Sequence, residues 1–379
     1  MTSELSSLCS YAKGKVSVDT LSKRNYVSTE NMMPNKGGIV DAGALPSAQY
    51  TQQYIKDDIL VSNIRPYFKK IWMADDDGGC SNDVLVFRAD RGCDSTFLYY
   101  ILANDAFFNY ASATSKGTKM PRGDKTAIMQ YKVPCFNYET QLRIGKLLRS
   151  IDDRIAVNKK INDNLQQQLF SLYENMATAS PCSKEYTLSN LCDFQEGYVN
   201  PPQTHPEYFD GEVKWLRAVD INESFIIETS RTLTKAGFES AKKSALLFEP
   251  NTIAISKSGT IGRLGIIADY MCGNRAVINI APHDTNMLAF IYCFLKSKQR
   301  EFPDMAVGSV QKNLYVSLLE PLSVSIPDNE SLTAFNAVGA SILGMIHNNC
   351  VENTDLANLR DTILPKLMSG ELDVSSVLL

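Results

Sequence analysis

The sequence predicts an α+β fold, in which two pseudo-twofold-related α/β heads are separated by a long antiparallel two-helix coiled coil. Three observations lead to this prediction: an internal duplication, a strand-rich first part in each copy, and a long helix that ends each copy. The chain has 379 residues, 44% hydrophobic and 21% charged. That composition is typical of a globular protein with two or three domains.

The duplication is visible at the start of the chain, where residues 5–14 (LSSLCSYAKG) resemble residues 188–197 (LSNLCDFQEG). Further short matches follow in the same order in both copies: Cys80 and Asn82 with Cys272 and Asn274, Gly117 with Gly308, and Pro134 with Pro327. Coincidence is the alternative explanation for any single match. Their shared order favours a repeated unit of about 190 residues.

The first part of each copy is a head, residues 1–135 in the first copy and residues 181–327 in the second. Branched residues next to turn-forming residues predict strands, and longer apolar segments predict helices. The expected strands are 58–62, 82–87, 251–256 and 275–280, and the expected helices are 96–110 and 287–300. A proline-containing strand closes each head, at 131–136 and 322–327.

The second part of each copy is a helical region, residues 136–180 and 328–379. Apolar residues recur there at seven-residue spacing: Ile144, Ile151, Leu165 and Leu172 in the first region, and Phe335, Ile342, Leu356 and Ile363 in the second. Asn158 and Asn349 occupy the same place in both series, and one polar residue in a coiled-coil core fixes its register.

A pseudo-twofold axis between the copies would make the two helices antiparallel and bring Asn158 and Asn349 close together. The helix expected from Glu139 to Met176 would be about 57 Å long at 1.5 Å per residue. Two independent amphipathic helices, each on its own core, are the alternative.

Composition excludes several classes of protein. The formal net charge is −4, so the chain is no bulk polycation, although local basic patches remain possible. No apolar run approaches the roughly 18 residues of a membrane helix, and the first residues lack the apolar core of a signal peptide. The nine cysteines form no CxxC pair and there are three histidines. We therefore expect no metal site, no disulfide scaffold and a cytoplasmic location.

Familiar catalytic motifs are absent: the sequence has no GxSxG, HExxH, Walker loop or strand-linked GxGxxG. Asn200-Pro201-Pro202 resembles the target-amine loop of amino-methyltransferases, but Gln203 replaces the aromatic residue that follows in that motif. Residues 258–265 (SGTIGRLG) follow a strand and form either a tight hairpin or a backbone cradle for a phosphate. We expect no catalytic residues, with an adenine methyltransferase built on Asn200-Pro201-Pro202 as the weaker alternative.

Polar and basic residues gather after a strand and again before the last strand of each head. Arg, Lys, Gln and Asn can read base edges in DNA, and Lys, Ser and Thr suit phosphate contacts. An ordinary solvated loop is the alternative explanation for any one cluster, but the recurrence of the clusters in both heads favours DNA binding. The candidate residues are Ser62, Asn63, Arg65, Lys69, Lys70, Lys116, Thr118, Lys119, Arg122, Arg217, Ser256, Lys257, Ser258, Thr260, Arg263, Gln311 and Lys312. Among these, the phosphate contacts are expected from Lys116, Lys119, Arg122, Lys257 and Lys312.

The whole pattern resembles the DNA-specificity subunit of type I restriction-modification systems. The closing segment 358–372 (NLRDTILPKLMSGEL) is similar to the second helical region of that family. Residues 215–221 (WLRAVDI) and 258–262 (SGTIG) are similar to its second target-recognition domain, while head 1 offers only residues 25–30 (NYVSTE) in that place.

This resemblance implies that each head is a target-recognition domain reading half of a split site in double-stranded DNA. It also implies that two methylation subunits dock on the helices and bring S-adenosylmethionine, and that a restriction subunit, the translocating nuclease, can join. The chain itself would catalyse nothing. A coiled-coil assembly scaffold that binds no nucleic acid is the competing hypothesis from another class.

Overall fold

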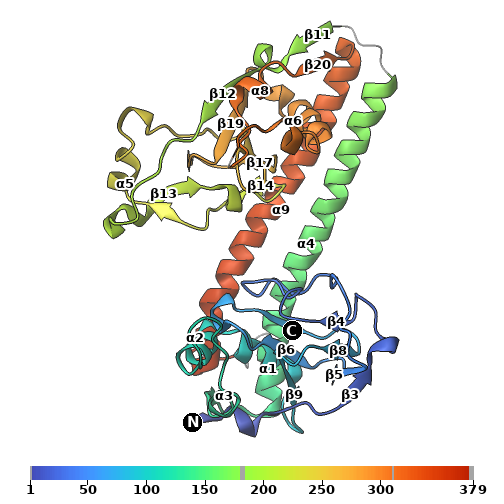
Figure 1. Cartoon of the computed structure of the whole chain (residues 1–379), viewed down its shortest axis with the longest axis vertical. Helices are drawn as coiled ribbons and strands as arrows, with labels where there is room; N and C mark the ends of the chain where they lie inside the picture. The colour runs from blue at the N-terminus through green and yellow to red at the C-terminus, as the bar shows by residue number, and fades with distance from the viewer. Residues whose placement is uncertain (1, 180–183, 310, 375–379) are drawn as a thin grey trace. The chain divides into compact units, whose positions relative to one another are not determined.

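The computed structural model describes residues 2–179, 184–309 and 311–374. The chain divides into two compact units (Figure 1). Unit 1 comprises Met1–Arg154 with Leu356–Leu379, and unit 2 comprises Ile155–Asp355. Each unit therefore contains one head and a part of both long helices.

Head 1 is built on two four-stranded sheets. One has the order β2 (Cys9–Tyr11), β9 (Val84–Ala89), β6 (Ile59–Ser62), β7 (Ile71–Met73). The other has the order β3 (Lys15–Ser17), β5 (Tyr50–Tyr54), β8 (Gly78–Cys80), β4 (Tyr26–Val27). A separate pair, β1 (Thr2–Glu4) with β10 (Lys132–Pro134), joins the ends of the head. The helices are α1 (Ser95–Ala103), α2 (Asp105–Ala113) and α3 (Lys125–Met129).

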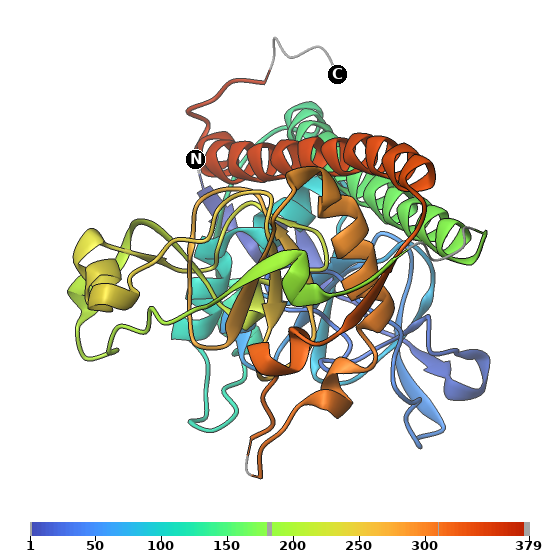
Figure 2. The same ribbon diagram turned by 90° about the horizontal axis from the view of Figure 1, so that it is seen from above.

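Head 2 has a five-stranded sheet of order β12 (Cys192–Glu196), β19 (Val277–Pro282), β16 (Ile253–Ser256), β17 (Leu264–Ile267), β14 (Phe225–Ile226). A smaller sheet has the order β15 (Thr232–Leu233), β13 (Phe209–Leu216), β18 (Cys272–Gly273). The pair β11 (Lys184–Thr187) and β20 (Ser323–Ile326) joins the ends. The helices are α5 (Lys235–Glu239), α6 (Leu288–Lys298), α7 (Phe302–Met305) and α8 (Val316–Leu319). In Figure 2 the segment around α5 protrudes from the rest of unit 2.

Strand register supports the duplication. Cys9 pairs with Ala89 in head 1 just as Cys192 pairs with Pro282 in head 2. The N–H of Leu5 donates to the carbonyl of Tyr131 at 2.8 Å, and the N–H of Leu188 donates to Leu322 at 2.9 Å. Because a one-residue slip would turn every side chain to the other face of a strand, this agreement reflects one repeated backbone.

Three of the sequence matches are out of register with the structure. Thr2 pairs with Pro134, and the equivalent ladder pairs Glu185 with Ser325, so Ser325 rather than Pro327 occupies the place of Pro134. Asn274 corresponds to Ser81 instead of Asn82, because Ser81 donates to Val27 as Asn274 donates to Leu216. Cys80 pairs with Val27 as Gly273 pairs with Leu216, so Cys80 corresponds to Gly273 instead of Cys272. Short sequence matches shift easily by a residue or two, whereas hydrogen-bond ladders do not.

The two long helices are α4 (Tyr138–Ala179) and α9 (Asn329–Ser369). In unit 1 they join the core of head 1 through Ile144, Leu148, Leu364 and Leu367. Arg360 of α9 also bonds to Asp152 of α4 at 2.6 Å.

Within unit 2 the two helices meet through asparagines. Asn158 donates to Glu352 at 2.8 Å and to Asn353 at 3.0 Å, while Asn349 donates to Asn162 at 2.8 Å. The contacts connect the helices in opposite chain order. Asn158 and Asn349 are thus not each other's hydrogen-bond partners, because each is aligned with a different residue of the opposite helix.

The expected apolar series is only partly buried. Ile144, Ile151, Phe335 and Ile342 are buried, but Leu172 is 41% exposed and Leu169 is buried in its place. The helix packs against head 2 as well as against its partner, so the buried face departs from a strict seven-residue pattern. No helix among the described residues is long and apolar enough to cross a membrane.

Candidate nucleic-acid interface

Each head carries the same short hairpin just before its last strand. In head 1 Lys116 and Arg122 exchange backbone hydrogen bonds of 2.8 and 2.9 Å, and in head 2 Val307 and Asn313 do so at 3.0 and 2.9 Å. A glycine follows the first residue of each hairpin: Gly117 with φ of 96° and Gly308 with φ of 140°. These angles suit glycine because it lacks a Cβ atom.

The hairpin is held against the loop that follows β6 or β16. Gly123 donates to the carbonyl of Asn63 at 3.1 Å in head 1, and Leu314 donates to the carbonyl of Lys257 at 2.9 Å in head 2. We call this pair of joined loops the clasp. The structure therefore brings together, within each head, the two polar loops that the sequence singled out separately.

In head 1 the hairpin cations are exposed, and two of them pair with carboxylates. Lys116 lies 2.5 Å from Asp124, and Arg122 lies 3.1 Å from Asp83. The hydrogen bond from Lys116, together with backbone N–H donors, lowers the pKa of Asp124. Thr118 and Lys119 are exposed beside them. The hairpin thus presents a mixed but net basic surface.

The other predicted residues of head 1 lie in the loop after β6 or at its end, and most of them are buried or paired with other residues of the head. Ser62 and Asn63 are buried, and Lys70 donates to the carbonyl of Thr29 at 2.6 Å, with burial lowering its pKa. Lys69 pairs with Asp105 at 2.8 Å. Arg65 adopts φ of 51° and is half-buried.

Two buried atoms in this loop have no hydrogen-bond partner in the described part of the chain: Oδ1 of Asn63 and Nε of Arg65. Buried polar atoms are usually paired, so both are available to a ligand or to water.

In head 2 Lys257 takes the place of Asn63, and its side chain is turned inward. Lys257 pairs with Glu196 at 2.9 Å and lies 4.8 Å from the ring centre of Tyr315, with 13% of its side chain exposed. Ser256 is fully buried, and its hydroxyl accepts from the N–H of Arg263 at 2.8 Å. These contacts fix the loop 256–263. Its outer face is formed by the exposed Thr260 and Arg263 and the half-buried Ser258, with the exposed Gln311 and Lys312 on the hairpin.

A polar network that sequence analysis missed supports the same loop. Gln299 donates to the carbonyl of Gly262 at 2.9 Å and to Glu223 at 2.7 Å, and Lys296 lies 2.5 Å from Glu223. Gly262 has φ of 86°, and a Cβ there would lie 3.0 Å from Phe302. Nothing in the spacing of Glu223 and Gln299 connects them, so only the fold reveals the pair.

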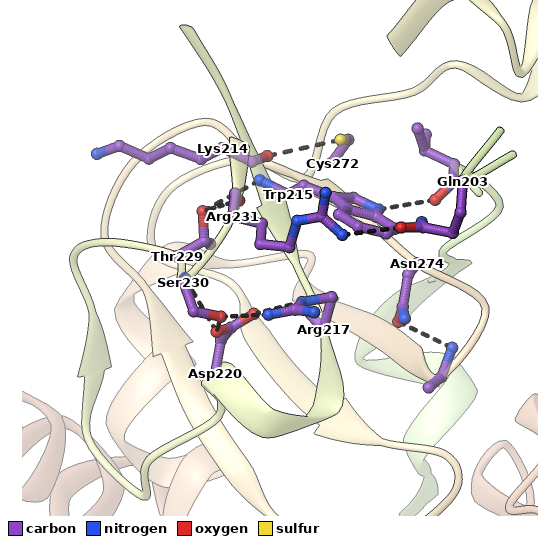
Figure 3. Close-up of polar contacts among 12 residues, drawn as sticks. Gln203, Lys214, Trp215, Arg217, Asp220, Thr229, Ser230, Arg231, Cys272 and Asn274 are labelled. Atoms are coloured by element: carbon purple, nitrogen blue, oxygen red, sulfur yellow. Dashed lines mark hydrogen bonds and ion pairs between the residues drawn. The ribbon is translucent and has the colours of Figure 1, made fainter. Parts of the chain in front are cut away.

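Arg217 lies in a different part of head 2, beside Trp215 (Figure 3). Its guanidinium is 5.6 Å from the Trp215 ring centre and donates to Ser230 Oγ at 2.5 Å. Its Nε is 3.6 Å from the Asp220 carboxylate, too far for a hydrogen bond. Arg231 and Gln203, which the sequence analysis did not include among the candidates, lie in the same cluster.

The Asn200-Pro201-Pro202 segment packs onto this cluster. The indole N–H of Trp215 donates to the carbonyl of Val199 at 2.8 Å, and Pro201 is buried. Among the described residues there is no group of three or more His, Cys, Asp or Glu side chains that could hold a metal ion.

Comparisons with known proteins agree with one another. The profile of the type I restriction modification DNA specificity domain matches residues 1–167 and 183–354. The chain is 26% identical to the type I restriction enzyme HindI specificity subunit of Haemophilus influenzae, covering 92% of this chain and 94% of that protein. It is 24% identical to the MjaIX specificity subunit of Methanocaldococcus jannaschii, covering 76% and 71%.

The fold is similar to a solved structure, the S subunit of a type I restriction-modification system from M. genitalium. The TM-score is 0.57 at 18% identity, and the match covers 97% of this chain and 96% of that one.

Proposed function

The chain belongs to the type I restriction modification DNA specificity family, and from this premise we propose that each head recognises one half of a bipartite site in double-stranded DNA. The chain is a specificity subunit and not the catalytic part of its restriction-modification system. The observation that carries the proposal is the clasp. Two heads with different side chains hold the same pair of polar loops through equivalent backbone hydrogen bonds.

The proposed DNA contacts are the residues on the outer face of each clasp. In head 1 these are Lys116, Thr118, Lys119 and Arg122, and in head 2 they are Ser258, Thr260, Arg263, Gln311 and Lys312. Cations and hydroxyls suit phosphates, while Arg and Gln can also read base edges. The buried Ser62, Ser256 and Lys257 hold the loops in shape, so their part in binding is to position the exposed residues.

We further propose that 1–135 and 181–327 are the two target-recognition domains and that 136–180 and 328–379 form an antiparallel coiled coil between them. The opposite chain order of the Asn158–Asn353 and Asn162–Asn349 contacts supports this arrangement. A polar core residue that is satisfied across the pair would favour one register.

The proposed protein partners are two methylation subunits that dock on the helices and supply S-adenosylmethionine chemistry, with restriction subunits joining the complex in the cytoplasm. Support comes from apolar side chains that the helices leave exposed: Val157 at 48%, Ile161 at 41%, Val338 at 48% and Met345 at 48%. Burial of these side chains against a partner would favour docking on the helices.

The test is to express the chain with the methylation subunits encoded beside it and map modified adenines by long-read sequencing. We expect one bipartite motif with an unread spacer. A continuous motif, or the same motif after both clasps are altered, would contradict the proposal.

Two simpler assays address the alternatives. A scaffold without nucleic acid predicts no retention of DNA in a filter-binding assay even at low salt. An adenine methyltransferase built on Asn200-Pro201-Pro202 predicts tight binding of S-adenosylmethionine by the chain alone.

A further inference from the structure

Head 2 contains an arginine site that lies outside its clasp. The Arg231 guanidinium lies over the face of Phe209, 4.2 Å from the ring centre, and is 5.9 Å from the ring centre of Trp215. Its Nη1 donates to Oε1 of Gln203 at 3.0 Å. Figure 3 shows the Arg231 side chain directed toward Gln203, close to the Trp215 ring.

Arg231 differs from the neighbouring cations in having no carboxylate partner among the described residues. Lys214 pairs with Asp269 at 3.0 Å and Glu228 at 3.2 Å, and Arg217 lies 3.6 Å from Asp220. The bond to Gln203 uses one of the five N–H donors of Arg231. A half-buried cation with unused donors fits a site whose acceptor comes from a ligand.

The segment that carries Gln203 is held rigidly. The Val199 N–H donates to Gly273 at 3.1 Å, the Val199 carbonyl accepts from Trp215 at 2.8 Å, and two prolines follow. Gln203 and the Phe209 ring therefore fix both the position and the plane of the Arg231 fork. This fixed plane is the feature that distinguishes Arg231 from an ordinary surface arginine.

Residues 196–203 connect the clasp of head 2 to the Arg231 site along the chain. Glu196 accepts from Lys257 of the clasp at 2.9 Å and from the Tyr198 hydroxyl at 3.0 Å. The chain then runs from Tyr198, which is 49% exposed, through the rigid segment to Gln203. The segment 196–203 therefore joins two parts of head 2, the clasp and the Arg231 site.

We propose that Arg231 reads a guanine in the half-site bound by head 2, with Gln203 and Phe209 as positioning residues. This inference rests on the proposed function. A planar, fixed arginine fork matches the O6 and N7 acceptors of guanine in the major groove. Arginine can also bind phosphate in a bidentate way, so the experiment below distinguishes a base contact from a phosphate contact.

The experiment compares R231K, R231A and Q203A with a matched control, R300A, which removes an exposed arginine elsewhere in unit 2. Each full-length chain is co-expressed with the methylation subunits, and its methylation motif and its binding to duplexes with single base-pair changes are measured. R231K keeps the positive charge but loses the planar set of N–H donors of the guanidinium. We expect it to relax one G·C position in one half-site, with selectivity there falling about 10- to 100-fold.

Q203A should relax the same position to a smaller extent, and R300A should keep the wild-type motif. If R231A proves unstable on heating, R231K and Q203A still carry the test. Uniform weakening on all duplexes with a lower salt slope would make Arg231 a phosphate contact and overturn the proposal. An unchanged motif in R231K, or relaxation of both half-sites, would also overturn it.

These failures are distinguishable from failure of the proposed function. If the wild-type complex yields no bipartite motif, the proposed function itself is wrong. If the wild type yields such a motif and R231K yields the same one, only the inference about Arg231 fails.

Discussion

The two heads share a backbone but balance charge in different ways. In head 1 a bidentate pair lies at the start of β6, the end opposite the clasp, where Arg88 donates to the buried Asp58 at 2.8 and 2.7 Å. Ile59 and Phe87 pair as Ile253 and Ile280 do, so Thr252 and Ala281 occupy the equivalent places in head 2. In head 2 the internal ion pair lies in the clasp itself, where Lys257 is turned onto Glu196.

This difference shows that the duplicated ladder tolerates several internal charge arrangements while presenting its loops in the same way. Backbone hydrogen bonds carry the shared geometry, and side chains remain available for different DNA sequences. Four changes would break or sharpen the comparison.

Removing Arg88 should have the largest effect. R88A leaves Asp58, which is 1% exposed, without its main partner. We expect a loss of about 2–3 kcal/mol, below the value for a fully buried pair because 37% of the Arg88 side chain is exposed. Thermal unfolding measures the loss, and hydrogen exchange assigns it to head 1.

The matched control is D58T/R88A, which reproduces the residue pair of head 2 closely. It should recover most of the lost stability because no buried charge remains. Equal destabilisation by R88A and by the double variant would show that packing, not the buried charge, sets the cost.

Replacing the hairpin glycines by alanine should give the next largest loss of stability, and the loss should be larger in head 2 than in head 1. A Cβ at Gly308 would lie 2.2 Å from the carbonyl oxygen of Gln311, whereas at Gly117 the nearest atom is 3.6 Å away. We expect G308A to cost about 1–3 kcal/mol locally and G117A about 1 kcal/mol.

Motif mapping provides the readout, since G308A should degrade recognition of one half-site and leave the other intact. Equal effects of the two variants, or loss of both half-sites from either one, would contradict separate hairpins of the described geometry.

The clasp lysines should separate phosphate contact from positioning. Lys119 is exposed, and its ammonium group has no hydrogen bond or ion pair among the described residues, so K119A should weaken binding to all sequences and lower the salt slope by about 1. Lys257 is committed to Glu196, so K257A should leave the slope nearly unchanged and reduce selectivity in one half-site. Binding titrations at several salt concentrations measure the salt slope of both variants. A lower slope for K257A but not for K119A would make Lys257 the phosphate contact and Lys119 the positioning residue.

The smallest effect concerns acid stability in head 1. Partial burial opposes ionisation of Asp105, but hydrogen bonds from Lys69 and Lys36 outweigh it and lower the pKa of this carboxyl. The stability contributed by Asp105 is therefore present above its ordinary pKa near 4 and lost as pH falls through the lower folded value.

D105N should cost no more than about 1 kcal/mol at pH 7, since the Asp105 side chain is 55% exposed. The difference from wild type should shrink as the pH falls below about 4. Denaturant unfolding at pH 7 and pH 3 measures it, and a pH-independent difference would mean that the carboxylate charge is not the cause.

Much of the fold could be predicted from local pattern, and so could the polar loops from which the proposed site is built. The duplicated Leu-Ser-x-Leu-Cys segment, the branched strands and the long uninterrupted helices are all local signals. The same signals failed where alignment depended on partners, as with Pro134, whose ladder counterpart is Ser325. Local signals also failed for Leu172. Its exposure depends on which face of α4 is covered by head 2.

The sequence by itself determined that this protein has two related heads, two long helices and a polar loop pair in each head. Backbone propensity and hydrophobic period are properties of neighbouring residues, so they can be read along the chain. Only the tertiary structure decided that Lys257 is turned onto Glu196, that Gln299 supports Gly262, and that Arg231 is held by Gln203. Those contacts join residues far apart in sequence, and burial and charge pairing depend on what the fold brings together.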